Sequence, residues 1–321
     1  TETRTPPPTI ATRPSVCIVV FIRLRASSPN GRPLASTRGT ASTVIASATE
    51  MKRAVRLAGV AAPADHAAPV VGRDLELEQG ATPLFVLVHR HLVGLKSRLG
   101  VVPTDGVFPL CPSFDTVGPL GRTVADVARL WSVLSGRPVP APRLDGLTIG
   151  LLRRAPALGD GRATEESDAA EARVGELERL GARVVEAAIS GPDVDVWPVF
   201  QHEALRSHAA TFPARADRYG AAVRAKLEAA TRVEPEAVTA GYRSLLAWRQ
   251  LEPEVDLYVS PCVAVDWPAE DADELDVRLP LSSFLRWVNL LGWAGLAIGN
   301  LQLVAPRDET VLAAGLALER G

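Results

Sequence analysis

VGLKSRLGVVPTDGVFPLCPSFDTVGPLGRTVADVARLWSVLSG, residues 93–136, is the stretch of sequence that decides the fold. It begins with a short apolar run, passes through a segment rich in glycine and proline, and ends in a helical pattern. Thr123, followed three positions later by Asp126, is a capping box for a helix that starts at Val124. Apolar residues then recur at helical spacing until Gly136, a residue type typical of helix ends. The stretch predicts a strand, an irregular loop and an amphipathic helix.

The glycine-rich turn before this helix is flanked by two opposite charges, Asp115 and Arg122. A carboxylate–guanidinium pair between them is expected to pin the loop, because the two groups form strong bidentate hydrogen bonds.

Downstream of this stretch, short apolar runs alternate with segments of helical spacing, which is typical of an α/β domain. The last helix begins at Asp308, an expected N-cap. Gly181 follows the first of these helices as a C-terminal stop. The predicted strands are 147–152, 183–189, 255–260 and 301–305, and the predicted helices are 165–180, 197–210, 219–230, 235–250, 283–291 and 308–320.

The stretch resembles the segment that follows the active-site serine loop in the amidase-signature family, where a G-L-K-P-T-x-G run precedes P-S-x-D-T-x-G-P-x-x-R-T-V-x-D. The C-terminal residues 255–261 and 301–319 also resemble the closing strands and helix of that family. The positions of the first stretch that match are Gly94, Leu95, Lys96, Gly100, Pro112, Ser113, Asp115, Thr116, Gly118, Pro119, Arg122, Thr123, Val124 and Asp126.

The resemblance covers about residues 93–320 and implies an α/β fold with a mixed central β-sheet covered by helices. It divides the chain into a lead, residues 1–92, that does not match and an amidase-signature domain, residues 93–321, that forms the C-terminal two-thirds of an incomplete family fold. Between residues 291 and 301 the family has a longer substrate-side loop, where this chain has only GWAGLAIGN.

Family members hydrolyse carboxamides to carboxylate and ammonia through a Ser–Ser–Lys triad, without metal or organic cofactor. The triad should precede Lys96, but the sequence between Ser47 and Ser97 contains no serine. Ser27 and Ser28 match the family's serine loop only superficially, and Lys52 lies in a context unlike that of the triad lysine. No catalytic residue is therefore assigned, and the chain is predicted to be inactive.

Two explanations of this loss remain open. Residues 1–64 hold two acidic residues, eight arginines and one lysine, and their character changes abruptly before residue 93. This favours a shifted reading frame or an incorrect gene structure upstream, so that the chain represents a fragment of the enzyme. The alternative is a divergent, non-catalytic binding or scaffolding relative. Membership of a tRNA-dependent amidotransferase, as one of its subunits, ranks below both.

Composition limits the other function classes. The net charge of −2 gives no reason to expect nucleic acid or an anionic membrane as partner, and no apolar run is long enough for a membrane span. Three widely spaced cysteines predict neither a disulfide framework nor a zinc site, so a cytoplasmic location is expected. A small-molecule amide is the partner that the resemblance implies.

The candidate metal-binding histidines and acidic residues are interpreted as structural or solvated. His89 and His91 have no third ligand nearby, and His202 and His208, six apart on a helix, face different sides. The acidic run at 270–276 lacks the spacing of a calcium loop. The tryptophans are interpreted as core or edge packing, with an acyl pocket at Trp287 and Trp293 as the alternative. They are Trp131, Trp197, Trp248, Trp267, Trp287 and Trp293.

Overall fold

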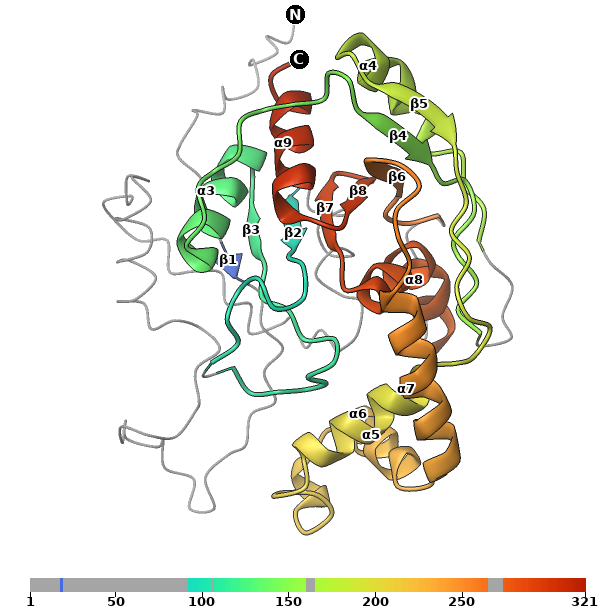
Figure 1. Cartoon of the computed structure of the whole chain (residues 1–321). Coiled ribbons are helices and arrows are strands. Elements are labelled where there is room, and N and C mark those ends of the chain that lie inside the picture. The colour runs from blue at the N-terminus through green and yellow to red at the C-terminus, as the bar shows by residue number, and fades with distance from the viewer. Residues whose placement is uncertain (1–17, 20–91, 106, 160–164, 265–273) are drawn as a thin grey trace, which may run out of the picture.

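A computed structural model of the chain describes residues 18–19, 92–105, 107–159, 165–264 and 274–321 (Figure 1). These residues build a mixed sheet in the order β1-β3-β2-β7-β8-β6-β4-β5. Only the β4–β5 and β4–β6 pairs are parallel, and the remaining neighbours are antiparallel. The strands are β1 (Ile18–Val19), β2 (Val93–Lys96), β3 (Pro119–Gly121), β4 (Thr148–Leu151), β5 (Arg183–Glu186), β6 (Leu257–Pro261), β7 (Ala294–Ile298) and β8 (Leu301–Ala305). The predicted α/β fold with a mixed central sheet is confirmed.

Helices lie on both faces of the sheet and in a separate group beneath it (Figure 1). None of those in the described ranges is long and apolar enough to cross a membrane. They are α3 (Val124–Ser135), α4 (Val174–Arg179), α5 (Trp197–Ser207), α6 (Ala221–Ala230), α7 (Pro235–Arg249), α8 (Glu274–Leu291) and α9 (Asp308–Leu318), with 3-10 turns η1 (Glu171–Arg173) and η2 (Ala216–Arg218).

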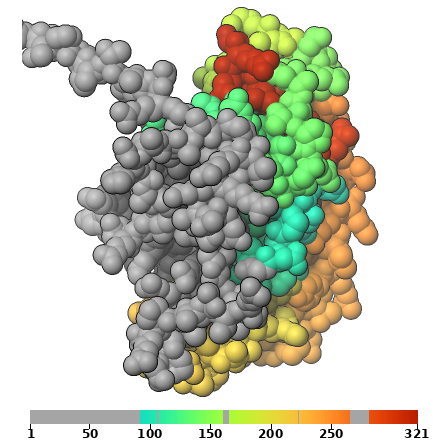
Figure 2. All heavy atoms as spheres, turned by 90° about the vertical axis from the view of Figure 1, so that its left-hand side faces the viewer, coloured from blue at the N-terminus to red at the C-terminus, as the bar shows by residue number. Residues whose placement is uncertain are grey.

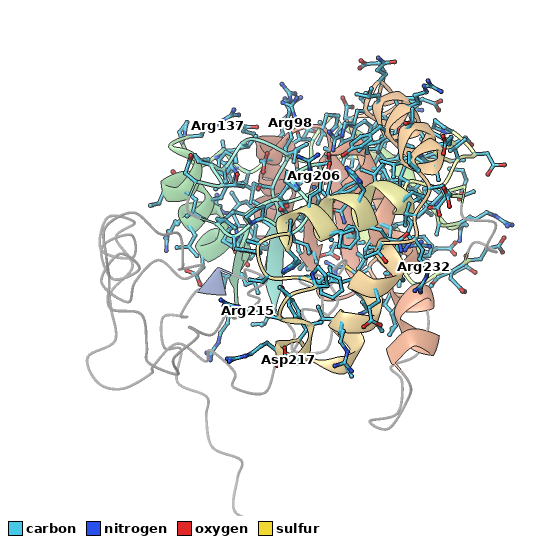
Figure 3. All side chains as sticks on the ribbon, turned by 90° about the horizontal axis from the view of Figure 1, so that it is seen from below. Arg98, Arg137, Arg206, Arg215, Asp217 and Arg232 are labelled. Atoms are coloured by element: carbon cyan, nitrogen blue, oxygen red, sulfur yellow. The ribbon has the colours of Figure 1, made fainter. Side chains whose placement is uncertain are left out.

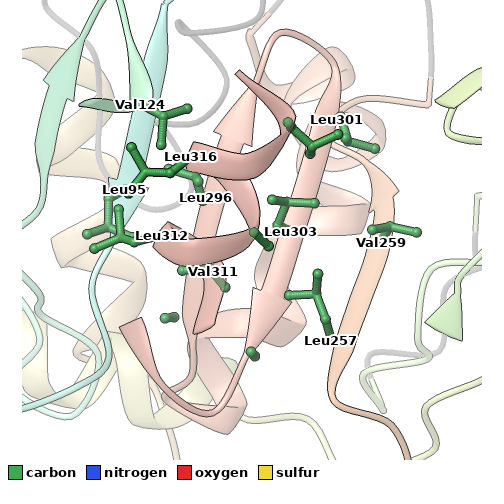
Figure 4. Packing of buried hydrophobic residues seen from close by; sticks show 14 of the residues in the cluster. Leu95, Val124, Leu257, Val259, Leu296, Leu301, Leu303, Val311, Leu312 and Leu316 are labelled. Carbon is green, nitrogen blue, oxygen red and sulfur yellow. The ribbon is translucent and has the colours of Figure 1, made fainter. Parts of the chain in front are cut away.

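Helices α3 and α9 cover one face of the sheet, and Figure 2 shows them meeting at the surface. Strand side chains alternate between faces with a period of two, so Leu257 and Val259 of β6 point toward this side. Leu303 of β8 joins them, and Val311 and Leu312 of α9 pack on top (Figure 4). All five side chains are fully buried. Burial of this apolar surface holds the central strands to the two helices.

The opposite face packs against α8. Tyr258 and Val304, the neighbours of the residues that face α9, are buried here with Trp287 and Trp293. The Tyr258 ring is stacked on Trp293 at 6.1 Å and meets Trp287 edge-on at 6.4 Å, measured between ring centroids. Both faces of the central strands are therefore buried, which explains why these strands are nearly continuous apolar runs.

The expected loop between residues 291 and 301 is instead an antiparallel hairpin of β7 and β8, with Leu296 opposite Leu303. Its turn contains Gly299, which adopts a φ of 57°, and Asn300. A Gly–Asn pair between two apolar runs is a hairpin signal in the sequence. The expected short loop is therefore a strand, because its apolar residues complete the sheet.

Some predicted helix starts and caps differ from the structure; the helix expected from 283 begins earlier, at Glu274, as α8. The helix expected from 165 begins later, as η1 and α4, because Glu166 forms an isolated antiparallel bridge with Arg154. Its predicted end is confirmed, since Gly181 has a φ of 90°. Asp308 does not cap α9: the N-cap is Arg307, without a side-chain hydrogen bond, and Asp308 lies in the first turn.

Candidate functional site

Glu203, in the middle of α5, accepts four hydrogen bonds on its carboxylate. Oε1 accepts from Ser113 Oγ at 2.6 Å and from Tyr242 OH at 2.7 Å. Oε2 accepts from Ser113 N at 2.8 Å and from Cys111 Sγ at 3.1 Å. The side chain thus joins α5 and α7 to the loop at 110–115, which lies within the stretch 93–136 that resembles the family. Ser113 in this loop is 90 positions earlier in the chain than Glu203.

These bonds set the pKa values of the cluster. Burial raises the pKa of Glu203, but hydrogen bonds from Ser113, Tyr242 and Cys111 outweigh it and the pKa lies below its ordinary value. Burial and the Glu203 carboxylate raise the pKa of Tyr242 to about 12. Burial, again with Glu203, raises the pKa of the Cys111 thiol far above neutrality. Glu203 is therefore the anion of the cluster, while Cys111 stays a protonated thiol and is no nucleophile.

The loop that faces Glu203 is held by Asp115, but not through the expected ion pair. The Asp115 carboxylate accepts hydrogen bonds from Leu110 N at 2.9 Å and from Cys111 N at 3.1 Å. Arg122 is exposed and forms no ion pair with Asp115 among the described residues. Backbone donors satisfy the carboxylate because the loop folds back over it, which a sequence pattern cannot reveal.

Arg249, at the end of α7, donates a hydrogen bond from Nη2 to the carbonyl oxygen of Ser113. Burial lowers the pKa of Arg249, and the nearby Glu203 carboxylate acts to raise it. Both side chains are half-buried, and each of the two opposite charges offsets part of the other.

A pocket of about 340 Å³ opens beside this cluster. Its wall combines one face of α5, where His202 and Arg206 are one turn apart, with Tyr242 of α7 and the start of the family-like loop. The lining residues are Pro112, His202, Glu203, Arg206, Ser207 and Tyr242. The spacing of His202, Glu203, Arg206 and Ser207 is a signal that could have indicated a shared helix face in the sequence.

A second polar cluster lies beneath α9. Asp308 is fully buried, and its carboxylate accepts hydrogen bonds from Arg98 N at 3.1 and 3.2 Å. Lys96 Nζ donates to Trp293 O at 2.9 Å and to Ser97 O at 3.3 Å. Burial lowers the pKa of Lys96 to about 7, although Asp308 acts to raise it. These contacts join β2 to the C-terminal elements.

The structure describes only some of the residues weighed in the sequence. Ser97 is buried, and its Oγ donates to Val117 O at 2.5 Å. The hydroxyl of this serine therefore satisfies a backbone carbonyl group. Trp287 and Trp293 lie in the core rather than in a pocket, whereas Trp197 is 42% exposed. Residues that fall outside the described ranges are Cys17, Ser27, Ser28, Ser47, Lys52, His89, His91, Trp267 and 270–273.

His202 lines the pocket, whereas His208 is buried and lies 3.1 Å from Tyr219 OH through Nδ1. The described ranges contain no group of histidine, cysteine and acidic side chains arranged to hold a metal ion.

Comparison with known proteins identifies relatives over much of the chain. The chain is 28% identical to 2-amino-5-chloromuconic acid deaminase of Comamonas testosteroni over 258 residues, which is 70% of this chain and 55% of that protein. It is 36% identical to one of the subunits of glutamyl-tRNA(Gln) amidotransferase of Symbiobacterium thermophilum over 114 residues, covering 30% of this chain and 23% of that protein. The chain thus spans about half, or less, of the length of these curated relatives.

The fold agrees with the sequence relatives. The structure of 6-aminohexanoate cyclic dimer hydrolase aligns with a TM-score of 0.59 and 18% identity, over 74% of this chain and 61% of that one. A family profile described as Amidase matches residues 89–303, which is most of the chain. The family-like stretch, the mixed sheet and this match lead to one conclusion: the chain belongs to the amidase-signature family.

Proposed function

We propose that this chain has the fold of an amidase-type hydrolase, an enzyme that cleaves the C–N bond of a small-molecule carboxamide, and that the chain itself does not turn over amides. Family membership supports the reaction class. The stretch between Ser47 and Ser97, which contains no serine, supports the inactivity, because the family's nucleophile belongs there. An activated hydroxyl needs a base within hydrogen-bond reach, and neither partner is identifiable in this chain.

The proposal divides the chain at the start of β2. Residues 93–321 form the amidase-signature domain, and residues 1–92 are a lead that does not match the family. Within the domain, Glu203 and Asp115 hold the loop at 110–115. Asp308 of α9 holds the backbone just after β2, and Lys96 joins β2 to the residue before β7. These contacts stabilise the family fold without needing a reacting serine. The free thiols of Cys111 and Cys262 agree with a cytoplasmic location.

The test is to purify the full chain and measure ammonia release from aliphatic and aromatic amides, together with labelling by a serine-directed fluorophosphonate. A cooperative thermal transition, followed by circular dichroism, verifies that the protein is folded. We expect a cooperative transition, no ammonia above the buffer control and no label. Turnover would end the proposal of inactivity, and turnover that survives replacement of Ser27 and Ser28 by alanine would also exclude those serines as nucleophiles.

The origin of the lead can be tested separately from activity. Translation of the nucleotides upstream of codon 93 in the other two frames is expected to produce a glycine- and serine-rich loop. The absence of such a loop in both frames would favour the divergent, non-catalytic relative over a shifted frame.

Membership of a tRNA-dependent amidotransferase complex is a second candidate function, and the similarity over 114 residues to one component of such an enzyme favours it. This function requires companion proteins. Co-purification of the tagged chain with such companions from its own host, combined with glutamine-dependent transamidation, would support this candidate, and an isolated chain would argue against it.

A further inference from the structure

We propose that the pocket on helix α5, lined by His202, Arg206 and Tyr242, binds the carboxylate of a small organic acid. This proposal concerns binding alone and does not depend on whether the chain hydrolyses amides. It follows from which polar groups of the pocket are already used and which remain available.

The one acidic group that the described residues contribute to the pocket wall, Glu203, has its acceptors used within the protein. An ionised carboxylate has about four lone-pair sites, and Glu203 accepts four hydrogen bonds, two on each oxygen. Ser207 Oγ donates its only hydrogen to Leu110 O at 3.1 Å, and Tyr242 OH donates its own to Glu203, so neither hydroxyl has a donor left for a ligand. Glu203 is therefore saturated and offers no acceptor to an ammonium or amide N–H group of a ligand.

The nitrogen donors of Arg206 and His202, by contrast, remain available. Among the described residues, the guanidinium of Arg206 and the ring of His202 form no hydrogen bond or ion pair with a protein side chain. Arg206 is an exposed residue that lines the pocket. It acts to lower the pKa of Tyr242, against the larger effects that raise it. Figure 3 views this helix group from below and labels Arg206. A ligand that accepts hydrogen bonds is the one that suits these groups.

The charge balance also favours an anion. Glu203 has its own cationic neighbour, Arg249, whose pKa the Glu203 carboxylate acts to raise. Arg206 therefore forms no ion pair with a carboxylate of the pocket wall among the described residues. A guanidinium presents a planar fork of N–H donors that matches the two oxygens of a carboxylate.

Geometry and volume restrict the ligand further. His202 and Arg206 are four residues apart on α5, so their side chains project from the same face and can reach one ligand group. Pro112 and the Tyr242 ring supply apolar surface beside them. A pocket of about 340 Å³ is at the small end of the range for ligand sites, which suits an aromatic ring or short chain that ends in a carboxylate.

Benzoate and benzamide are matched probes, because they share a ring and differ in the charge of the head group. Calorimetric titration of the full chain should show saturable binding of benzoate, in the millimolar range, and affinity for benzamide about tenfold weaker or less. Arg206→Gln should weaken benzoate binding by about tenfold, since a charge-assisted bidentate contact is lost. Arg243→Gln is the matched control: this arginine is also exposed, adjoins Tyr242 in the sequence and does not line the pocket.

Each result decides the proposal. Selective benzoate binding that Arg206→Gln weakens and Arg243→Gln leaves unchanged supports it. Equal affinity for benzoate and benzamide, an equal loss in both arginine variants, or tighter binding of inorganic phosphate than of benzoate would overturn it. Because Arg206 is exposed, its replacement is expected to preserve the fold. His202→Gln is a second variant, and it should also weaken the binding of benzoate.

Discussion

Glu319, just beyond the end of α9, accepts a hydrogen bond from the backbone N–H of Val124 at 2.6 Å, across 195 positions of the chain. Its second oxygen accepts from Ala125 N at 3.0 Å. Thr123, the predicted N-cap, accepts from Asp126 N at 3.1 Å. The first N–H groups of a helix have no partner within the helix, and in α3 a local residue and a distant one share the task of satisfying them.

Glu319→Ala is therefore expected to destabilise the protein by about 1 kcal/mol, because two N–H groups and the positive end of the helix dipole lose their acceptor. Glu319→Gln should cost less, since one oxygen remains. Urea unfolding measures both, with Arg320→Gln as a control at the neighbouring exposed position. An unchanged midpoint for the alanine variant would show that the cap adds nothing to stability.

Gly118 lies against the backbone of β2. A Cβ at this position would be 1.7 Å from Leu95 O and 2.9 Å from Leu95 C. Gly118→Ala should therefore force the two chain segments apart and destabilise the protein by about 3 kcal/mol or more. Gly175 in α4 has no atom within 4 Å of the corresponding Cβ, so Gly175→Ala should be neutral or stabilising. Thermal unfolding compares them, and similar transitions for the two variants would contradict the close approach.

The lowered pKa of Lys96 predicts that the stability of the protein depends on pH. Burial lowers its pKa from 10.5 to about 7 in the folded protein, so the unfolded chain binds a proton that the folded protein does not as pH falls through this range. The free energy of unfolding therefore decreases as pH falls from 10.5 to about 7, and the loss is complete below about pH 7. The Lys96→Met variant lacks this titration. The difference in free energy of unfolding between the variant and the wild type should therefore shift in favour of the variant by more than about 1 kcal/mol as pH falls from 9.5 to 7.5. Denaturant unfolding at both pH values provides the measurement, and a constant difference would show that Lys96 is protonated in the folded state throughout.

Glu203→Gln should destabilise the helix group by about 2 kcal/mol, because the amide nitrogen places donors against the donors of Ser113 and Tyr242. Tyr242→Phe removes only one of the four hydrogen bonds and should cost about half as much. The pKa of Glu203 lies below its ordinary value of 4.5 in the folded protein, so its contribution is present above that pH and is lost as pH falls through the folded pKa. Urea unfolding should show that the difference in free energy of unfolding between the wild type and Glu203→Gln becomes smaller below about pH 4.5. A difference that does not change with pH would show that the substitution acts through packing alone.

Local patterns in the sequence predicted many of the elements correctly. Thr123 and Gly136 bound α3 as expected, and Gly136 has a φ of 69°. Strand β8 begins and ends at the predicted residues, Leu301 and Ala305. These predictions succeed because capping and the two-residue alternation of strands depend on neighbours in the sequence. The family-like stretch also identified the family, which the match over residues 89–303 confirms.

Other features depend on residues that are distant in the sequence, and only the folded chain brings them together. The sequence marked Asp308 as the cap of its own helix, but its carboxylate accepts from the distant Arg98 N. Asp115, expected to pair with Arg122, accepts from backbone N–H groups instead. The pocket required α5, α7 and the loop at 110–115 to converge, with Glu203 between them. A sequence determines which groups need partners and which segments form helices or strands. The choice of partner is made by tertiary packing, because a buried charge is stable only where the fold places enough donors around it.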